Sequence, residues 1–259
     1  MLYKELLESC KERFDDFFKN TTLFENQFTW SDYNEHLYEL MYKTNSYENF
    51  RTVKDLKENV AELKDLCKKC GSYFMPQRNK SIPKYDVILG KQHEEAMMDF
   101  LSSKLDTVVT RADLENRSLP DCKILKRDGS VAAYFEVKFH GAPFVSAINM
   151  TGRYCYEGSA TLDYKKIEKQ LMLIKEGLDA PVFYVHWLEY PCLKGVFFET
   201  SEQVEEYIKG QHEVFDRMKR DGDDQKSSKS IYLKKMYSPL LKMGEFEEFL
   251  KILSGLVEE

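Results

Sequence analysis

The sequence contains no long hydrophobic run and no secretory signal. None of its apolar stretches approaches the roughly 20 residues needed to span a bilayer, and the first residues lead directly into an amphipathic pattern. Its six cysteines are scattered, apart from one Cys-x-x-Cys pair. With no signal peptide, these cysteines are expected to be reduced thiols, and the sequence predicts a cytoplasmic protein without a membrane segment.

The sequence also lacks an excess of positive charge. Its 38 lysines and arginines are outnumbered by 44 aspartates and glutamates, which gives a formal net charge of −6. This balance argues against a protein that coats nucleic acid through bulk positive charge, but it is compatible with a local basic cleft. Hydrophobic residues make up 42% and aromatic residues 14% of the chain, which excludes a uniformly disordered protein. Neither a phosphate-binding glycine loop nor a Ser-His-Asp arrangement is evident.

The apolar spacing divides the chain into three regions. A length of 259 residues allows one large domain or a core with a helical annex. Residues 1–83 show helical spacing, clearest over residues 53–69, and end in a segment with prolines and basic residues that predicts a linker. Residues 84–200 form the predicted core. Residues 201–259 form a predicted C-terminal helical extension with a polar loop at 220–230.

Within the core region, the hydrophobic period changes several times. Helical and extended patterns follow one another in the order helix, three strands, helix, two strands. The expected bounds are a helix at 91–104, strands at 107–111, 122–126 and 131–139, a helix at 162–176, and strands at 182–188 and 195–198. This order predicts an α/β fold with a mixed central sheet flanked by helices.

The most informative segment runs from Asp121 to Lys138. Side chains alternate between the two faces of a strand, so the apolar residues at 131, 133, 135, 137 and 139 should face the core, while Glu136 and Lys138 emerge together on the opposite face. Asp128-Gly129 is a strong signal for a two-residue hairpin turn. Pairing outward from this turn places Asp121 beside Glu136 within a residue or two. Two carboxylates and one ammonium group are therefore expected at one end of the sheet.

A divalent cation would suit such a cluster. Two carboxylates about 4 Å apart repel by about 4 kcal/mol at an effective dielectric constant of about 20, so we expect the empty site to be strained. All-oxygen ligation with open water positions suits Mg²⁺ or Mn²⁺. A bound ion lowers the pKa of its water and offsets charge on a phosphoryl group. Lys138 could then orient or help to deprotonate the attacking water, or stabilise the phosphorane.

Pro120-Asp121 followed by Glu136-Val137-Lys138 resembles the motif of the PD-(D/E)XK nucleases. That superfamily includes type II restriction endonucleases, Holliday-junction resolvases and repair nucleases. The resemblance covers residues 90–198, and the expected order of elements matches the core of that family, the restriction-endonuclease-like fold. It implies that Asp121, Glu136 and the backbone carbonyl of Val137 bind the metal and that Lys138 serves the nucleophilic water.

Many members of this superfamily also carry a glutamate on the first core helix, a few residues after a glycine. The segment Gly90-Lys91-Gln92-His93-Glu94 is similar to that pattern. Glu94 shares the apolar stripe of Met97 and Leu101, whereas Glu95 points about 100° away around the helix. The resemblance therefore implies Glu94, and not Glu95, as a further catalytic residue and metal ligand.

Weaker signals lie on the helix expected at 162–176. Gln170 lies against its apolar stripe, and a buried amide needs partners. Gln170 therefore either supports the active site, as in some members of the family, or lies at the edge of the stripe. Lys165, Lys166 and Lys169 belong either to a solvated face or to a rim that contacts phosphate, and Lys165 and Lys169 are the candidates for nucleic-acid contact.

The loop at residues 140–160 lies just past the motif strand, where a substrate would pass. It places Arg153, Tyr154 and Tyr156 among glycines, which offers a cation for phosphate and aromatic surfaces for bases. Nucleic-acid contact by Arg153 and Tyr154 is one interpretation, and a simple surface loop is the other.

Cys67 and Cys70 resemble half of a zinc knuckle. A structural zinc ion needs four ligands, and no second pair stands at a suitable spacing. Cys67 also ends an apolar helical stripe, so simple burial is the alternative to zinc binding.

Together these features predict a metal-dependent endonuclease that hydrolyses DNA, with Mg²⁺ or Mn²⁺ as cofactor and a restriction-type enzyme as the leading subtype. A duplex cut on both strands calls for two active sites, so we expect a homodimer. The alternatives are a repair or recombination nuclease such as a Holliday-junction resolvase, an RNA endonuclease, and a non-catalytic nucleic-acid-binding module on the same fold.

Overall fold

The computed structural model describes residues 2–20, 58, 83–114, 116–141, 144, 146–158, 160–190, 193–219 and 231–258. Four of the sequence predictions lie outside these residues. They are the helix at 53–69 apart from residue 58, the predicted linker at 71–83 apart from Pro83, the Cys67/Cys70 pair and the loop at 220–230.

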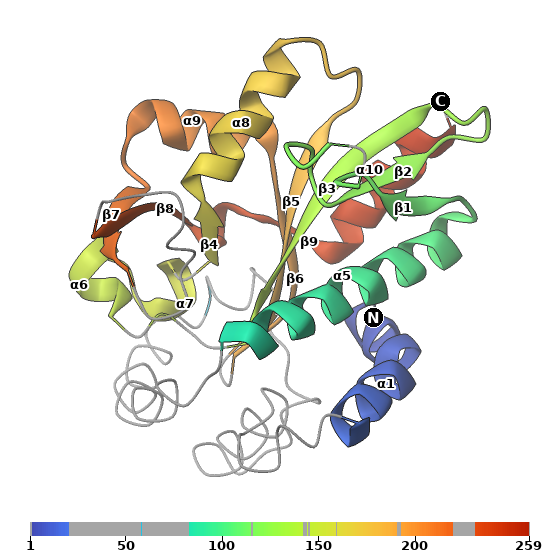
Figure 1. Ribbon diagram of the computed structural model, residues 1–259, viewed down its shortest axis with the longest axis horizontal. Coiled ribbons are helices and arrows are strands. Elements are labelled where there is room, and N and C mark those ends of the chain that lie inside the picture. Colours follow the sequence, from blue (N-terminus) through green and yellow to red (C-terminus); the bar gives the residue numbers. More distant parts are fainter. Residues whose placement is uncertain are drawn as a thin grey trace.

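A mixed six-stranded sheet forms the centre of the fold (Figure 1). Strands β3 and β5 run parallel, and the other neighbours in the sheet are antiparallel. In spatial order the strands are β1 (Val109–Arg111), β2 (Cys122–Leu125), β3 (Val131–His140), β5 (Val182–Glu189), β6 (Lys194–Thr200) and β9 (Gly244–Glu245). Helices flank this sheet on both faces, so the predicted α/β class with a mixed central sheet is confirmed.

Three helices cover one face of the sheet, and they come from three parts of the chain. They are α1 (Leu2–Asn20), α5 (Pro83–Leu105) and α10 (Phe246–Glu258). Leu6, Met97 and Phe249, one from each helix, are fully buried in a single cluster with Phe135 and Val185 of the sheet. The first and last segments of the chain therefore share one hydrophobic core with the region at 84–200.

Helix α5 begins eight residues before the helix expected at 91–104. Proline suits the first turn of a helix, where its missing N–H needs no partner, and Pro83 is the first residue of α5. The predicted helix at 91–104 leaves Gly90 just before its first residue, whereas α5 contains Gly90 in its interior. A Cβ at Gly90 would meet nothing within 4 Å, so this glycine marks no close contact and costs the helix about 1 kcal/mol relative to alanine.

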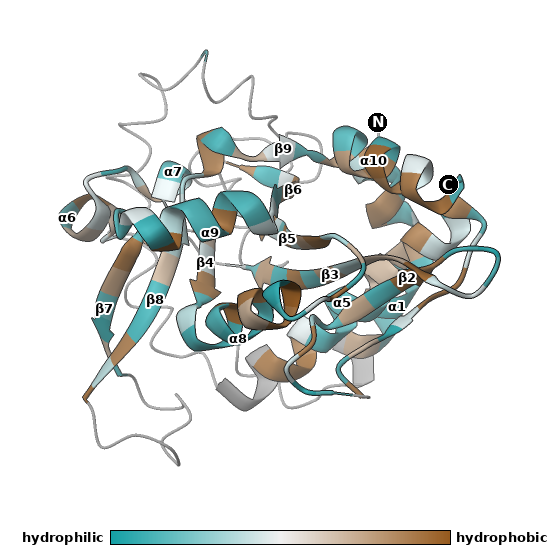
Figure 2. Ribbon diagram, turned by 90° about the horizontal axis from the view of Figure 1, so that it is seen from above, coloured by the Kyte–Doolittle hydropathy of each residue, from teal (hydrophilic) through white to brown (hydrophobic). Residues whose placement is uncertain are grey.

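The opposite face carries two helices and a smaller sheet (Figures 1 and 2). The helices are α8 (Tyr164–Lys175) and α9 (Ser201–Gly210), and the sheet has the order β4 (Ala160–Asp163), β8 (Tyr232–Ser238) and β7 (Val214–Met218). The short helices α6 (Ala147–Thr151) and α7 (Cys155–Gly158) and the 3₁₀ turn η2 (Leu240–Lys242) lie on the same side. The expectation of a purely helical extension after residue 200 is thus corrected, because β7, β8 and β9 lie there as well.

The β2–β3 hairpin forms where Asp128-Gly129 predicted it, but with a three-residue loop in place of a two-residue turn. The Lys126 N–H donates to the Ser130 carbonyl at 2.8 Å, and the Gly129 N–H donates to the Lys126 carbonyl at 3.0 Å. Gly129 has a φ of 85°, in the left-handed region that glycine adopts without strain. This is a type I turn followed by a left-handed residue, the usual three-residue hairpin loop.

A buried ion pair joins the end of strand β5 to the start of β6. The Lys194 ammonium lies 2.7 Å from a Glu189 carboxylate oxygen, and both side chains are buried. Trp187 donates its indole N–H to the same carboxylate at 3.1 Å, and the Tyr3 hydroxyl of α1 donates to it as well. The pair therefore also ties the first helix to the sheet.

Among the helices that the structure describes, none combines the length and the apolar character that crossing a membrane requires.

Replacement of Lys194 by methionine tests this buried pair. Lys194→Met should lower the free energy of unfolding by about 3 kcal/mol, because the Glu189 carboxylate loses its buried counter-charge while the Tyr3 and Trp187 donors remain. Lys175→Met is the matched control, since Lys175 pairs with Glu205 at 2.8 Å but is 65% exposed, and its loss should cost less than about 1 kcal/mol. Urea denaturation at pH 7 measures both, and equal losses would contradict the assignment.

Candidate active site

Strand β3 extends past the end of its neighbour β2, and the candidate site lies at that point. The first residue of β2, Cys122, is the register partner of Phe135. Asp121, immediately before β2, therefore falls beside Glu136, as the hairpin register predicted. Beyond Phe135, β3 pairs with β5 in the part of the sheet that the structure describes.

Asp121, Glu136 and Lys138 lie together at this edge. The Lys138 ammonium is 2.6 Å from Glu136 Oε1 and 3.9 Å from Asp121 Oδ2. Glu136 is 2% exposed although it lies on the face opposite Phe135, because α8 covers it. Both faces of β3 are thus buried here, and the polar face carries the charged cluster.

Lys166 of α8 completes the cluster, and sequence reasoning did not assign it to the site. Its ammonium lies 2.6 Å from Asp121 Oδ1 and 2.9 Å from Glu136 Oε2, so it bridges the two carboxylates. Lys166 was expected on a solvated face or a phosphate-contacting rim. The signal that could have placed it is its spacing of four residues from Gln170, which puts both side chains on one face of the helix.

Gln170 faces the site and is 1% exposed. Its side-chain amide donates to Glu136 Oε2; the nitrogen must be the atom that faces Glu136, since an ionised carboxylate accepts hydrogen bonds and donates none. Of the two interpretations of Gln170, the structure places it against the candidate site.

Glu94 of α5 lies at the margin of the cluster. Its side chain is 16% exposed and accepts a hydrogen bond from Arg111 of β1 at 2.7 Å. Arg111, which the sequence did not single out, also binds Asp113 at 2.9 Å. Glu95 points instead toward α1, where it pairs with Arg13 at 2.7 Å. The choice between the two glutamates from helical spacing agrees with this arrangement.

The charges of the cluster compensate one another. Burial opposes ionisation of Glu136, but Lys138 and Lys166 outweigh it and lower the pKa of this carboxyl. Burial also opposes protonation of Lys138 and Lys166, yet the neighbouring carboxylates raise the pKa of both ammonium groups. Burial and the charge of Asp121 raise the pKa of Glu94. The expected strain between two carboxylates is therefore relieved by two lysines of the protein itself.

Several buried polar atoms around the carboxylates lack a hydrogen-bond partner in the described part of the chain. They are Asp121 Oδ2, Gln170 Oε1 and the hydroxyl of Tyr184, which lies beside Glu136 in the β3–β5 register. Such orphaned atoms point to a water or an ion that completes their hydrogen bonds or coordination. Among the described residues, no three His, Cys, Asp or Glu side chains form a ready metal-binding group. Mg²⁺, however, is commonly held by one or two carboxylates together with waters and substrate phosphate, and Asp121 and Glu136 fit that pattern.

The other predicted site residues lie apart from the carboxylates or on the surface. Arg153 binds Glu213 and donates to the Tyr237 carbonyl at 2.6 Å, so its guanidinium is engaged within the protein. Tyr154 stacks on Tyr156 with ring centroids 5.9 Å apart. Lys165 and Lys169 are exposed on α8, the helix that carries Lys166 and Gln170. Nucleic-acid contact by these residues stays a prediction.

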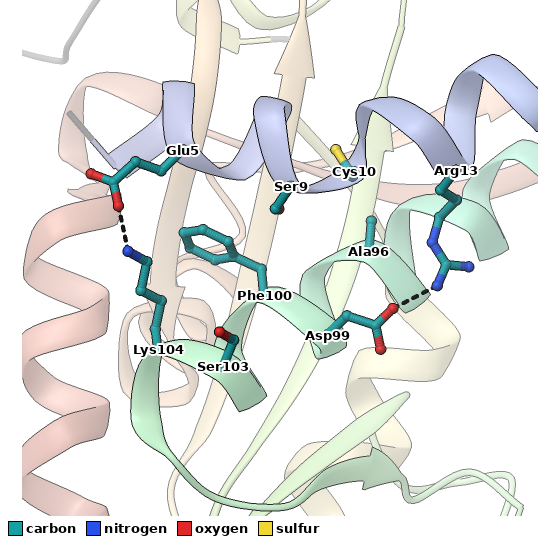
Figure 3. A pocket seen from close by; sticks show the side chains of 9 residues that line it. All are labelled: Glu5, Ser9, Cys10, Arg13, Ala96, Asp99, Phe100, Ser103 and Lys104. Carbon is teal, nitrogen blue, oxygen red and sulfur yellow. Dashed lines mark hydrogen bonds and ion pairs between the residues drawn. The ribbon is translucent and has the colours of Figure 1, made fainter.

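A surface pocket of about 400 Å³ lies elsewhere, between α1 and α5 (Figure 3). Its charged residues pair with one another, Arg13 with Asp99 at 2.5 Å and Lys104 with Glu5. Burial raises the pKa of the Cys10 thiol in its wall to about 12, so this cysteine is protonated and unreactive at neutral pH.

No protein-family model and no curated protein matches this chain. Among solved structures, the chain is similar to that of D212, a nuclease from a fusselovirus, with a TM-score of 0.37 and 14% sequence identity. The alignment covers 66% of this chain and 90% of that chain.

Replacement of Lys166 tests the charge compensation. Because the folded-state pKa of Glu136 lies below its ordinary value of 4.5, its contribution to stability is present above pH 4.5 and is lost as the pH falls through the folded-state pKa. Lys166→Met should raise that pKa and reduce the free energy of unfolding at pH 7 by about 2 kcal/mol.

The control for this measurement is Lys165→Met, one residue away and exposed. Its stability should equal that of the wild type, whereas the deficit of Lys166→Met should narrow as the pH falls from 7 to 3. Urea denaturation across this range measures both effects. A deficit that stays constant with pH would show that Lys166 acts through packing and not through the carboxylates.

Proposed function

We propose that this protein is a metal-dependent nuclease of the PD-(D/E)XK type that hydrolyses phosphodiester bonds in DNA. One observation carries the proposal: Asp121, just before β2, and Glu136 and Lys138 of β3 converge at the start of β2, with Lys166 and Gln170 of α8 against them. Perturbed titratable groups with specific charge partners are typical of functional sites.

Asp121, Glu136 and the backbone carbonyl of Val137 are the proposed ligands of a Mg²⁺ or Mn²⁺ ion, with Glu94 reaching in from α5. All of these donors are oxygen atoms, the ligand type that both ions prefer. When bound, the cation lowers the pKa of a coordinated water and offsets the charge that develops on the phosphoryl group.

Lys138 acts as a hydrogen-bond donor in this proposal. The carboxylates around it raise its pKa, so it is an ammonium at neutral pH and has no lone pair with which to accept a proton. An ammonium can orient the attacking water and stabilise the charge on the phosphorane. Of the roles expected from the sequence, orientation and charge stabilisation fit the structure better than deprotonation.

Lys166 and Gln170 hold the carboxylates in place. Gln170 fixes one oxygen of Glu136 by hydrogen bonding, and Lys166 bridges Glu136 to Asp121. A divalent cation held by Asp121 and Glu136 would compete with the Lys166 ammonium for the same oxygens. Lys166 would then be available to contact a phosphate, as proposed for the exposed Lys165 and Lys169 of the same helix.

The restriction-type subtype and the homodimer belong to the same proposal. Cleavage of both strands of a duplex is served by two copies of the site related by a twofold axis. Light scattering with and without duplex DNA tests this part by itself, and a monomer under both conditions would contradict it.

Incubation with nucleic acid tests the proposed function directly. Purified protein is mixed with plasmid DNA, with single-stranded DNA and with RNA, each in the presence of Mg²⁺, Mn²⁺ or EDTA. Metal-dependent cleavage of DNA supports the proposal, and cleavage of RNA alone would support the RNA endonuclease. Binding without cleavage of any substrate would leave a non-catalytic nucleic-acid-binding module.

Lys138→Met should lower the rate of DNA cleavage about 10²–10³-fold, because the lysine stabilises charge that develops in the transition state. Its dissociation constant for DNA should change little. Glu136→Gln and Asp121→Asn should lose Mn²⁺ binding together with cleavage, as measured by titration calorimetry. Lys175→Met, at the far end of α8, is the control for a general loss of lysine charge. Cleavage by Lys138→Met at the wild-type rate, with an unchanged melting temperature, would falsify the assignment of Lys138.

Removal of the competing ammonium should also change metal affinity. Lys166→Met should bind Mn²⁺ about tenfold more tightly than the wild type, because a positive charge within 3 Å of both ligands is lost. Lys165→Met should bind as the wild type does. Electron paramagnetic resonance of free Mn²⁺ measures both affinities, and weaker binding by Lys166→Met would contradict competition for the same oxygens.

A further inference from the structure

The hairpin of strands β7 and β8 extends beyond the small sheet to which it belongs. Strand β4 pairs with β8 only from Ser238 to Lys235, whereas β7 continues beside β8 as far as the pair Met218 and Tyr232. Within the described part of the chain, the outer half of the hairpin therefore has no third strand paired with it. We call this outer half, residues 216–219 and 231–234, the arm.

The end of the arm exposes large apolar side chains to solvent. Met218 and Ile231 are each 64% exposed, and Tyr232 is 49% exposed. Met218 and Tyr232 are directly opposed, so they share a face of the arm with the pair Asp216 and Lys234 two residues further in. Apolar side chains gathered on an exposed surface mark a contact with another molecule.

This face of the arm adjoins helix α8. The Lys234 ammonium lies 5.1 Å from the centroid of the Tyr164 ring, a cation–π contact. Tyr164 is the first residue of α8, and Lys166, two residues later, bridges the two carboxylates of the candidate site. Successive residues turn about 100° around a helix, which places the exposed Lys165 and Lys169 on the arc between Tyr164 and Lys166. Lysines thus lead from the arm to the candidate site, and Figures 1 and 2 show β4 and α8 between β3 and this hairpin.

The charge of this surface is opposite in sign to that of the whole chain. The arm and the first half of α8, residues 164–169, contain six lysines and arginines but only two acidic residues, Glu168 and Asp216. Asp163, just before α8, is paired with Lys235 at 3.0 Å. The formal net charge of the chain is −6. A local cationic surface on an acidic protein is complementary to a polyanion and lowers the barrier to its approach.

We propose that the arm and the exposed side of α8 bind double-stranded DNA beside the candidate site, with the end of the arm in the major groove. The proposal rests on the proposed function, whose substrate it specifies as a duplex. The major groove of B-DNA is about 12 Å wide and admits a two-stranded β-ribbon. Lys234 and the lysines of α8 contact phosphates, while Met218 and Tyr232 lie against base edges. A surface for single strands would stack successive bases on several rings, whereas the arm has one, Tyr232.

Binding measurements without cleavage test the lysines. Anisotropy of a fluorescent DNA duplex in EDTA gives the dissociation constant at several salt concentrations. Lys169→Gln combined with Lys234→Gln should bind about tenfold more weakly, and the log–log slope of its salt dependence should be about 2 less steep, because two phosphate contacts are lost. The control combines Lys4→Gln and Lys251→Gln, exposed lysines of α1 and α10 on the opposite face of the central sheet. The control should bind as the wild type does, and equal losses in both double variants would overturn the proposal.

The apolar end of the arm is tested by a change that leaves its charge intact. Met218→Thr combined with Tyr232→Thr keeps residues of high or moderate strand preference but removes most of the apolar surface. Duplex affinity should fall about fivefold, on the order expected for the loss of a buried apolar contact, with the salt slope unchanged. Val87→Thr, at a position 62% exposed on α5, is the control and should bind as the wild type does. Unchanged affinity in the arm variant would overturn its placement in the groove.

The wild-type protein supplies a test that needs no variant to fold. Saturating duplex in EDTA should protect Lys169 and Lys234 from reductive methylation, as detected by mass spectrometry, and should leave Lys4 and Lys251 reactive. Lack of protection at Lys169 and Lys234 with the duplex bound would overturn the proposal. Tighter binding of a single strand of the same sequence would overturn the assignment of a duplex.

Failure of this inference can be distinguished from failure of the proposed function. If the wild type binds duplex DNA through the arm but cleaves no nucleic acid with Mg²⁺ or Mn²⁺, the nuclease activity fails and the binding surface stands. If the wild type cleaves DNA and the arm variants bind and cleave equally well, the inference alone fails. If the wild type neither binds nor cleaves nucleic acid, both fail, and the exposed end of the arm is then a surface for another protein.

Discussion

The burial of one face of strand β3 is the constraint on which the rest of the site depends. Phe135 packs in the core between α5 and α10, and Phe139 stacks on His93 with ring centroids 3.6 Å apart. A slip of one residue would turn every side chain of the strand to the opposite face. The aromatic packing therefore fixes Glu136 and Lys138 toward α8, so that the hydrophobic core positions the polar groups without touching them.

Charge compensation makes this buried polar face tolerable. Removal of one member of a buried ion pair is costly because it leaves the other charge without a partner. The positive charges of Lys138 and Lys166 balance the negative charges of Asp121 and Glu136. Beside them, Arg111 forms an ion pair with Glu94. In the proposed function, a cation or a phosphate entering the site would have to replace the partners that these pairs already supply. Stability of the free protein and affinity for a ligand are thus opposed at this site.

Features determined by neighbouring residues could be predicted from the sequence, and features determined by distant contacts could not. Strand alternation and the Asp128-Gly129 turn placed Asp121 beside Glu136, and helical spacing turned Gln170 inward. Strands β7 and β8 were not predicted because β8 is stabilised by pairing with β4, far away along the chain, and β7 in turn pairs with β8. The place of Lys166 in the site was not predicted, because a lysine near the start of a helix is usually solvated. Only the tertiary position of α8 turns it toward two carboxylates.

The two lysines also limit what the carboxylate cluster can do by itself. Each ammonium donates hydrogen bonds and stabilises negative charge, and each is kept protonated by the carboxylates that it neutralises. A water that attacks phosphorus must give up a proton, so hydrolysis at this site would require an acceptor other than these two lysines.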